Sequence, residues 1–429
     1  MAPERLPPPQ LNNADWLERP QTQAVFSALQ REGYEARAVG GAVRNALLAR
    51  PVSDVDIATT ASPEEVMRLA AAAGLKAAPT GLAHGTITVI ADHIPYEVTT
   101  LRKDVETYGR HAKVVFTDDW AADARRRDFT INALYCGADG TVFDPLGGYA
   151  DLLAGRVRFI GDPRARIRED YLRILRFFRF TAEYALGSPD REGLLASVRE
   201  REGLAQLSGE RVHQELLRLL KASHALAAVE AMFEHGLLTL VVPAAPRPSL
   251  LRRLIDIERL LGLQPAPLRR LAVLAIEVRE DAERLRDRLK LSTAEFSALL
   301  RASLRKPELG TATAEREAKE YLYRHGVDHY RERVLMDWAR CGHPPLDTSM
   351  HALLALPDRW TAPAFPLGGG DVLAIGVPPG PRVGELLRQL ENWWIDAGFP
   401  DDPDAVQLQL SRLAQVEYRS KFETPSRNS

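Results

Sequence analysis

The sequence predicts an α+β protein, in which a small head domain built on a mixed sheet is followed by an elongated, all-helical remainder. Two observations predict this class. Between Pro20 and Ala150, short β-like runs alternate with helix-like runs, a pattern typical of mixed α/β domains. From Asp151 onward the strand signals fade, and long segments rich in Leu, Ala, Arg and Glu follow helical periodicity.

The elements follow one another in a clear order. The expected strands occupy residues 35–40, 55–59, 85–92, 96–102, 132–137 and 141–145. The clearest helical segments of the remainder are residues 167–185, 210–222, 249–261 and 268–290. Ser292 and Glu295 form a capping-box pattern that predicts one more helix start. We therefore divide the chain into a head at 20–150, a neck at 151–222, a body at 223–360 and a tail at 361–429.

Composition excludes several classes of protein. The two cysteines, Cys136 and Cys341, are too few for a disulfide framework or a thiolate zinc site. No apolar run approaches the roughly 18 residues that cross a bilayer, and the amino-terminal stretch has prolines and acids where a signal peptide is basic and then apolar. We therefore expect a cytoplasmic protein with no membrane association and no obligate protein partner. The net charge of −2 argues against indiscriminate coating of nucleic acid and leaves room for a local basic groove.

The stretch "AVGGAVRN" carries the first sign of chemistry. Gly40 and Gly41 follow an apparent strand and let the backbone turn sharply and approach a ligand. A helix amino terminus behind such a turn attracts phosphate, and Arg44 on its first turn can add a charge-assisted contact. A tight turn without a ligand would have the same sequence, and neither a Walker loop nor a GxGxxG fingerprint occurs. We interpret the stretch as a candidate phosphate site.

An acidic pair follows directly. Asp54 and Asp56 stand two residues apart on an apparent strand, so we expect both carboxylates on one face. Beside a phosphate site, such a pair can hold two hard divalent ions that bridge the attacking and leaving oxygens of a nucleotidyl transfer. Glu97 on a later strand is the candidate third carboxylate, and a solvent-facing strand residue is the alternative. The pattern predicts two Mg²⁺ ions.

A third element is "RRRDFTINAL", which begins at Arg125. Its arginines suit a triphosphate, and Asp128 can accept a hydrogen bond from a ribose hydroxyl, which an arginine cannot. A basic turn that merely caps an element is the alternative.

Together these motifs resemble the nucleotidyltransferase family that contains bacterial and mitochondrial CCA-adding enzymes and bacterial poly(A) polymerases. The matching pieces run in the family's order from about Ala38 to Leu220 and include "VGGAVRN", "DVDIATTASPEEVM", "YEVTTLR", "RRRDFTINAL", "DPLGGYADL", "REDYLRILRFFRF" and "GERVHQEL". A weaker likeness covers "PLGGGDVLAIGVPPGPRVGELL", which resembles the family's tRNA-contacting tail. One position departs: the family usually has Asp where this chain has Asn45, which leaves a charge-dependent role of that position open.

The resemblance implies a role for each matching residue. Asp54 and Asp56 match the metal ligands of the family, and we add Glu97 as a catalytic candidate. The nucleotide-binding positions that it implies are Gly41, Arg44, Arg127, Asp128, Asp170, Arg173, Arg176 and Arg179. The implied substrates are CTP, ATP and tRNA.

Within this set, Asp170 and Arg173 match the pair that recognises the incoming base. The sequence predicts both on one helix, three residues apart and therefore neighbours. A carboxylate only accepts hydrogen bonds and a guanidinium only donates them. Cytosine and adenine place an amine donor beside a ring-nitrogen acceptor, whereas uracil and guanine place a carbonyl beside an N–H, so such a pair favours CTP and ATP. Steps of three residues wind around a helix, so we expect Arg176 and Arg179 to contact phosphate or acidic residues of the neck instead.

Three functions fit these observations. The first is CCA addition to the tRNA 3′ end from CTP and ATP. The second is poly(A) synthesis, or partial addition of CC or A alone, by the same head. The third is a tRNA-binding protein without catalysis, against which the intact Asp54 and Asp56 argue. The segment 102–124, which resembles the family's flexible loop, and a tail that is not basic favour CCA addition.

Overall fold

The computed structural model describes residues 7–82, 85–108, 111–303, 309–310, 313 and 315–422. The chain forms two compact units: residues 1–251 with 264–303, and residues 252–263 with 304–429. The division into head, neck, body and tail stays a prediction. No helix among the described residues is long and apolar enough to cross a membrane.

A seven-stranded mixed sheet forms the head, in the order β3-β4-β5-β2-β1-β8-β9. Its strands are β1 (Ala36–Val39), β2 (Asp56–Thr59), β3 (Lys76–Gly81), β4 (Thr86–Ala91), β5 (Ile94–Thr100), β8 (Tyr135–Cys136) and β9 (Val142–Phe143). Only β2 and β5 run parallel; the other neighbours are antiparallel. The mixed sheet is confirmed, and six of its strands overlap the six predicted runs; the sheet's remaining strand, β3, was not predicted.

A separate hairpin follows the sheet's fifth strand. The segment 102–124, expected as a loop, forms β6 (Arg102–Tyr108) and β7 (His111–Phe116), which pair antiparallel, and then begins α5 (Trp120–Arg126). Asp119 caps α5, because its carboxylate accepts from the backbone N–H groups of Ala121 and Ala122 at 2.8 and 3.1 Å.

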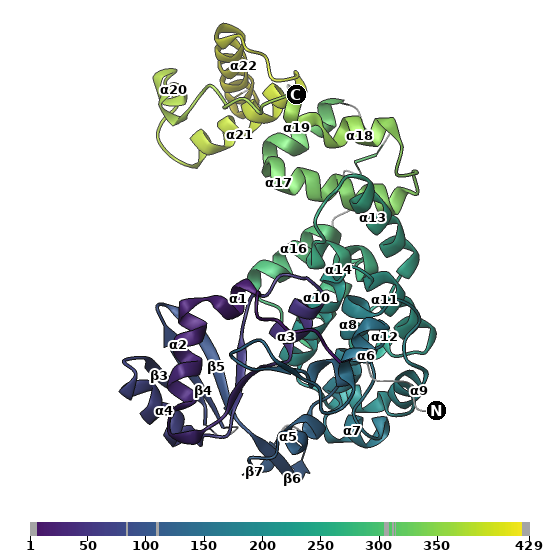
Figure 1. Ribbon diagram of the computed structural model, residues 1–429. Coiled ribbons are helices and arrows are strands. Elements are labelled where there is room, and N and C mark those ends of the chain that lie inside the picture. The colour runs from purple at the N-terminus through teal and green to yellow at the C-terminus, as the bar shows by residue number, and fades with distance from the viewer. Residues whose placement is uncertain are drawn as a thin grey trace, which may run out of the picture. The chain divides into compact units, whose positions relative to one another are not determined.

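Helices of the head lie against the strands of the sheet (Figure 1). The head helices are α1 (Asp15–Glu18), α2 (Pro20–Leu29), α3 (Gly41–Leu47), α4 (Pro63–Ala72), α5 and α6 (Gly148–Leu153), with short 3₁₀ turns η1 (Arg31–Gly33) and η3 (Thr130–Asn132). Helices α2 and α4 pack on the strands, and Ser62 caps α4 through the N–H of Glu65. In the head, the predicted site residues lie at the start of α3, at and just before the start of β2, in β5 and directly after α5.

The helical part of the first unit packs against the head through aromatic rings. Its helices are α7 (Pro163–Glu169), α8 (Leu172–Tyr184), α9 (Arg191–Arg199), η4 (Arg201–Gln206), α10 (Gly209–Lys221), α11 (Ala225–Glu234), α12 (Leu238–Val241), the start of α13 (Pro248–Leu260), α14 (Pro267–Ala275), α15 (Arg279–Leu289) and α16 (Thr293–Ser303). The ring centre of Phe129 in the head lies 5.3 Å from that of Phe180 and 6.4 Å from that of Phe177, and both of these residues belong to α8. These buried rings fix α8 beside the 125–134 motif.

One predicted helix is wrong in a way that matters for the site. The sequence predicts a single helix over 167–185, but the structure ends α7 at Glu169 and begins α8 at Leu172. Asp170 has extended backbone angles (φ −156°, ψ 108°), and its carboxylate accepts from the N–H of Leu172 at 3.1 Å. An aspartate that bonds to nearby backbone competes with helix formation, and here it satisfies the first turn of the next helix. Asp170 and Arg173 therefore do not share one helix.

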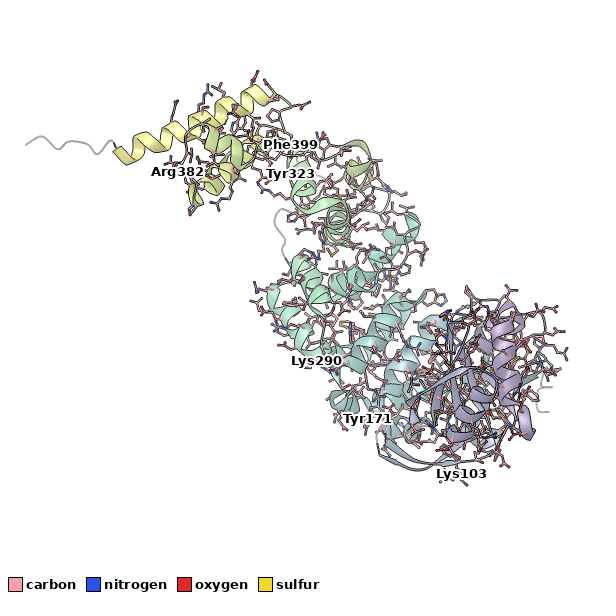
Figure 2. All side chains as sticks on the ribbon, turned by 90° about the vertical axis from the view of Figure 1, so that its left-hand side faces the viewer. Lys103, Tyr171, Lys290, Tyr323, Arg382 and Phe399 are labelled. Atoms are coloured by element: carbon pink, nitrogen blue, oxygen red, sulfur yellow. The ribbon has the colours of Figure 1, made fainter. Side chains whose placement is uncertain are left out.

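The second unit is helical, as predicted. It contains the rest of α13, then α17 (Glu315–Cys341), α18 (Thr348–Leu354), α19 (Leu356–Arg359), α20 (Gly369–Ala374), α21 (Pro381–Asp396) and α22 (Pro403–Phe422). Its core contains Trp394. The ring centres of Tyr323 and Phe399 lie 5.5 Å apart, and both residues are labelled in Figure 2. In the first unit, the capping box of Ser292 and Glu295 is confirmed at the start of α16, because each accepts from the other's backbone N–H.

Gly148 should tolerate no side chain. A Cβ there would lie 2.1 Å from the carbonyl oxygen of Thr130, which belongs to η3 beside the site. We expect Gly148→Ala to lower the free energy of unfolding by about 3 kcal/mol, because backbone must move. Gly187→Ala, where no atom lies within 4 Å, is the matched control and should change it by less than about 0.5 kcal/mol. Urea unfolding measures both, and equal midpoints would contradict this packing.

Candidate active site

A cavity of about 460 Å³ brings most of the predicted site residues together. Its lining contains Gly40, Gly41, Arg44, Asp56, Arg127, Asp128, Asn132, Asp170, Leu172, Arg173, Arg176, Arg179, Phe180 and Arg211. Six of these are arginines and three are aspartates, so the cavity carries an excess of positive charge. Of the predicted residues, only Asp54 and Glu97 are outside this lining. The composition of the cavity suits a polyanion.

The glycine turn forms one wall. Gly40 has φ +72° and donates its N–H to the carbonyl of Leu134 at 3.1 Å, which fixes the turn between β1 and α3. A Cβ at Gly40 would lie 3.7 Å from the carbonyl of Asn132 and 4.0 Å from Nη1 of Arg127, on a backbone conformation that side chains rarely adopt. The turn thus brings the start of α3 close to the arginines of the cavity.

Arg44 is the buried cation beside this turn. Only 7% of the residue is exposed, and its guanidinium donates to the Asn132 Oδ1 and, at 2.8 Å, to the Tyr184 hydroxyl. Burial lowers the pKa of Arg44, and the nearby Tyr184 and Glu183 oppose that shift. Because a guanidinium does not lose its proton in proteins, Arg44 remains a buried positive charge.

The carboxylates lie at the sheet. Asp56 opens β2, and register pairs it with Glu97 on the parallel strand β5, so both side chains emerge on the same face. The prediction that Asp54 and Asp56 stand on one strand is wrong, because β2 begins only at Asp56. Asp54 precedes the strand and accepts from the Ser53 hydroxyl at 2.9 Å. Loss of hydration, the charge of Glu97 and, to a smaller degree, that of Asp54 raise the pKa of Asp56 to about 6, while Arg127 opposes the shift. The carboxylates of Asp54 and Glu97 are therefore both close enough to that of Asp56 to influence it.

Arg127 and Asp128 are held by different neighbours. Arg127 donates to Asp123 at 3.0 Å and to the Tyr135 hydroxyl at 3.2 Å. Asp128 accepts from Nε of Arg176 at 2.7 Å and from the Asn132 amide at 2.9 Å. Burial works to raise the pKa of Asp128, but the charge of Arg176 and these hydrogen bonds hold it well below its usual range. Both side chains are therefore fixed and ionised.

The proposed base-recognition pair is engaged with other residues. Asp170 accepts two hydrogen bonds from Arg211 of α10, at 3.2 and 2.7 Å. Arg173 donates to the carboxylate of Glu169 and, at 2.7 Å, to the carbonyl of Arg166. Asp170 and Arg173 both line the cavity, although they lie on either side of the break between α7 and α8.

The two remaining arginines of α8 contact acidic residues. Arg176 bonds to Asp128, as above, and Arg179 donates to Glu215 of α10 at 2.6 Å and pairs with Glu183 at 3.4 Å. Arg179 contacts acidic residues of the predicted neck, which is one of the two expected alternatives, whereas the carboxylate nearest to Arg176 is Asp128 of the head motif.

Sequence reasoning missed Asn132 and Arg211 as site residues. Asn132 ends "RRRDFTIN" and accepts from Arg44 while donating to Asp128. Arg211 lies in "GERVHQEL", a stretch that resembled the family without an assigned role. Phe180 was not predicted as a site residue either, and it also lines the cavity. A positive residue on α10 could have been found only by knowing that α10 packs on α8.

The sequence is similar to known proteins over most of its length. The model of the poly A polymerase head domain matches residues 36–158, and a model described as a probable RNA and SrmB-binding site of polymerase A matches residues 194–246. The mitochondrial CCA tRNA nucleotidyltransferase 1 of Mus musculus is 36% identical over 408 residues, covering 92% of this chain and 93% of the relative. The chain belongs to the CCA tRNA nucleotidyltransferase family. It is therefore a nucleotidyltransferase, and the family expected from the motifs is confirmed.

Other members of the family are similar to parts or all of the chain. A CCA-adding enzyme of Geobacillus thermodenitrificans is 38% identical over 237 residues, covering 54% of this chain and 57% of that enzyme. The crystal structure of the Bacillus stearothermophilus CCA-adding enzyme in complex with CTP has a TM-score of 0.72 and 27% identity, and covers 93% of this chain and 98% of that one. A Thermotoga maritima CCA-adding enzyme complexed with tRNA has a TM-score of 0.66 at 21% identity, covers 92% of this chain and 94% of that one, and supports the fold alone.

The raised pKa of Asp56 predicts a pH-dependent stability in this family member. The carboxyl of Asp56 has a pKa of about 6 in the folded protein, above the ordinary 3.8. The folded state therefore holds this proton more tightly than the unfolded state, and the free energy of unfolding falls as the pH rises from about 4 to about 6. Asp56→Asn should therefore stabilise the metal-free protein at pH 8 by about 1 kcal/mol, less than the full pKa shift implies, because solvent still reaches part of the side chain and screens its charge. The substitution should have little effect at pH 4.5. Urea unfolding in EDTA at both pH values measures this. A gain of equal size at both would contradict the assigned cause, and Asp328→Asn on α17 is the control.

Proposed function

We propose that this protein adds CCA to the 3′ end of tRNA from CTP and ATP, without a nucleic-acid template. The observation that carries the proposal is the single cavity that joins a glycine turn and Arg44, the carboxylate of Asp56, and the pair of Asp170 and Arg173. A phosphate site, an acidic site and a base-selecting site are the three parts that template-free nucleotidyl transfer requires. The close family relationship supports the same conclusion.

We propose that Asp54 and Asp56 hold Mg²⁺ during this reaction. Among the described residues, no group of three or more His, Cys, Asp or Glu side chains is arranged as a ready metal centre. Mg²⁺ typically takes one or two carboxylates and completes its shell with substrate phosphates and water, so a carboxylate pair with oxygen donors fits it. When bound, the ions would activate the tRNA 3′ hydroxyl and stabilise the departing pyrophosphate. Glu97, beside Asp56 in register, is the candidate third carboxylate.

The chain's own residues would place the nucleotide. Gly41 at the start of α3 and the buried Arg44 would bind the triphosphate. Arg127 adds positive charge, and Asp128 presents an acceptor for a ribose hydroxyl. Attack of the tRNA hydroxyl on the α-phosphate forms one phosphodiester bond and breaks the α–β bond, with no covalent bond to the protein.

Base choice would come from Asp170 and Arg173. The carboxylate accepts from the exocyclic amine of cytosine or adenine, and the guanidinium donates to the adjacent ring nitrogen. UTP and GTP would place a carbonyl oxygen against the carboxylate and an N–H against the guanidinium, so neither contact could form, which disfavours these nucleotides strongly. Because Arg211 and Glu169 hold the two side chains, the pair keeps a defined position while the cavity is being filled.

The tRNA itself would contact the helical part of the chain. The matched segment 194–246 carries a description as an RNA-binding site, and a CCA-adding enzyme of the same fold is known in complex with tRNA. We extend the proposal to the tail at 361–429, on its resemblance to the family's tRNA-contacting segment. A cytoplasmic location likewise stays a prediction, since relatives include mitochondrial enzymes.

Poly(A) synthesis is the second candidate, because the head model that matches residues 36–158 is named for poly A polymerase. It uses the same parts and differs in which nucleotide is added and when addition stops. Only the product separates the two functions.

Extension of tRNA lacking its last three nucleotides tests the proposal. With magnesium, CTP alone should add two nucleotides, CTP with ATP should add three and stop, and UTP with GTP should add none. Asp54→Ala should lower the rate at least about 10³-fold, because it removes a ligand of the proposed ions. Asp328→Ala, which changes an exposed carboxylate of α17 in the second unit, is the control. Long A ladders from ATP alone would mean a poly(A) polymerase, and tRNA binding without extension would mean a binding protein.

Asp170→Asn tests base choice separately. An amide can donate to the carbonyl of uracil, so the preference for CTP over UTP in kcat/KM should fall about 100-fold. Glu210→Gln, which removes an exposed carboxylate beside Arg211 on α10, should leave that preference unchanged. An unchanged preference in Asp170→Asn would remove Asp170 from base recognition.

A further inference from the structure

Arg44 differs from the other arginines of the cavity in the chemistry of its partners. In the part of the chain that the structure describes, no carboxylate forms an ion pair with it, and its Nε has no hydrogen-bond partner. The groups that it contacts are the Asn132 and Asn45 side-chain oxygens and the Tyr184 hydroxyl, all neutral. A buried guanidinium without a carboxylate is unfavourable unless an anion reaches it.

The hydrogen bonds around Arg44 can run in only one direction. A guanidinium only donates, so the Tyr184 hydroxyl accepts from Nη2 at 2.8 Å and keeps its own proton for the Asn45 Oδ1 at 3.0 Å. The Asn45 amide then donates to the carbonyl of Pro51 at 3.1 Å, which fixes its oxygen toward Tyr184 and Arg44. Asn45 belongs to α3 and Tyr184 to α8, so this chain of bonds connects the glycine turn to the neck.

The aromatic rings of α8 complete the arrangement. The Arg44 guanidinium carbon lies 4.2 Å from the ring centre of Tyr184 and 5.2 Å from that of Phe180. Ring faces attract a cation without neutralising its charge. Hydrogen bonds and stacking thus fix the position of the Arg44 guanidinium, and no carboxylate of the described residues pairs with its positive charge.

The identity of residue 45 decides this balance. An aspartate there, the residue usual in the resembled family, would place a negative charge where the Asn45 Oδ1 lies 3.5 Å from Nη2 of Arg44. That charge would offset part of the attraction for phosphate. Asn45 retains the acceptor and omits the charge.

We propose that Tyr184 and Asn45 are positioning residues that hold Arg44 through neutral hydrogen bonds, so that its full charge acts on the triphosphate of the incoming nucleotide. This rests on the proposed function and assigns these two residues a part in it. Because CTP and ATP share the triphosphate, loss of either group affects both nucleotides equally and leaves base choice intact.

Binding of inorganic tripolyphosphate in EDTA, measured by calorimetry, tests the proposal without the reaction or the metal. Tyr184→Phe keeps the ring and removes the hydroxyl, and Asn45→Asp is nearly isosteric and adds the charge. Each should weaken tripolyphosphate binding about tenfold, since each perturbs a hydrogen bond or charge at a buried guanidinium. The KM values for CTP and ATP should rise by one common factor while kcat at saturation stays within about twofold.

Tyr323→Phe is the matched control, because its hydroxyl donates to Glu391 at 2.6 Å in the second unit. It should leave tripolyphosphate binding unchanged. Thermal unfolding identifies a variant that fails to fold. If one of the two variants fails to fold, the other one alone still tests the proposal.

Two results would overturn the inference. One is wild-type tripolyphosphate affinity in a folded variant of Tyr184 or Asn45. The other is a change in the preference for CTP over ATP, which would place the two residues in base recognition. If the wild-type protein still adds C and A to tRNA, either result removes this inference and leaves the proposed function standing; a wild-type protein that adds neither nucleotide would remove the function itself.

Discussion

The ion pair between Asp128 and Arg176 is the contact on which the site depends. Asp128 belongs to the head motif and Arg176 to α8. The aspartate accepts hydrogen bonds from Nε and Nη2 of the arginine, at 2.7 and 2.5 Å. Next to it, Phe129 packs on the rings of α8. This junction brings the glycine turn, proposed to bind phosphate, and Asp170 and Arg173, proposed to recognise the base, to one cavity. Together with the contacts of Phe129, it holds α8 against the head motif and so joins the two walls of the cavity.

The excess of arginines in the cavity is resolved by pairing. Each of the other five arginines that line it has a carboxylate partner: Arg127 with Asp123, Arg173 with Glu169, Arg176 with Asp128, Arg179 with Glu215 and Arg211 with Asp170. These pairs orient side chains before a ligand arrives. Arg44, held by neutral groups, supplies attraction for the anion. In this cavity, the five paired arginines hold side chains in position, and Arg44 is proposed to attract the triphosphate.

Local sequence patterns predicted the parts of this site but not how they meet. The glycine turn, the strand that begins at Asp56 and the buried Phe177 follow from periodicity and from residue type. The break at Asp170 did not, because helical periodicity continues across it and a single side-chain bond to the backbone decides it. The roles of Arg211 and Tyr184 depend on packing between α8, α10 and α3, which only the folded chain defines. Long-range contacts between elements are the information that a linear pattern lacks.

The central claim is that protein side chains select the base while a separate group of residues binds the triphosphate. A crystal structure with a non-reactive CTP analogue and Mg²⁺ tests this most directly. We expect the cytosine amine at the Asp170 carboxylate, the ring nitrogen at Arg173, and the triphosphate between Gly41 and Arg44. A cytosine bound away from Asp170 and Arg173, or phosphates without contact to Arg44, would contradict it.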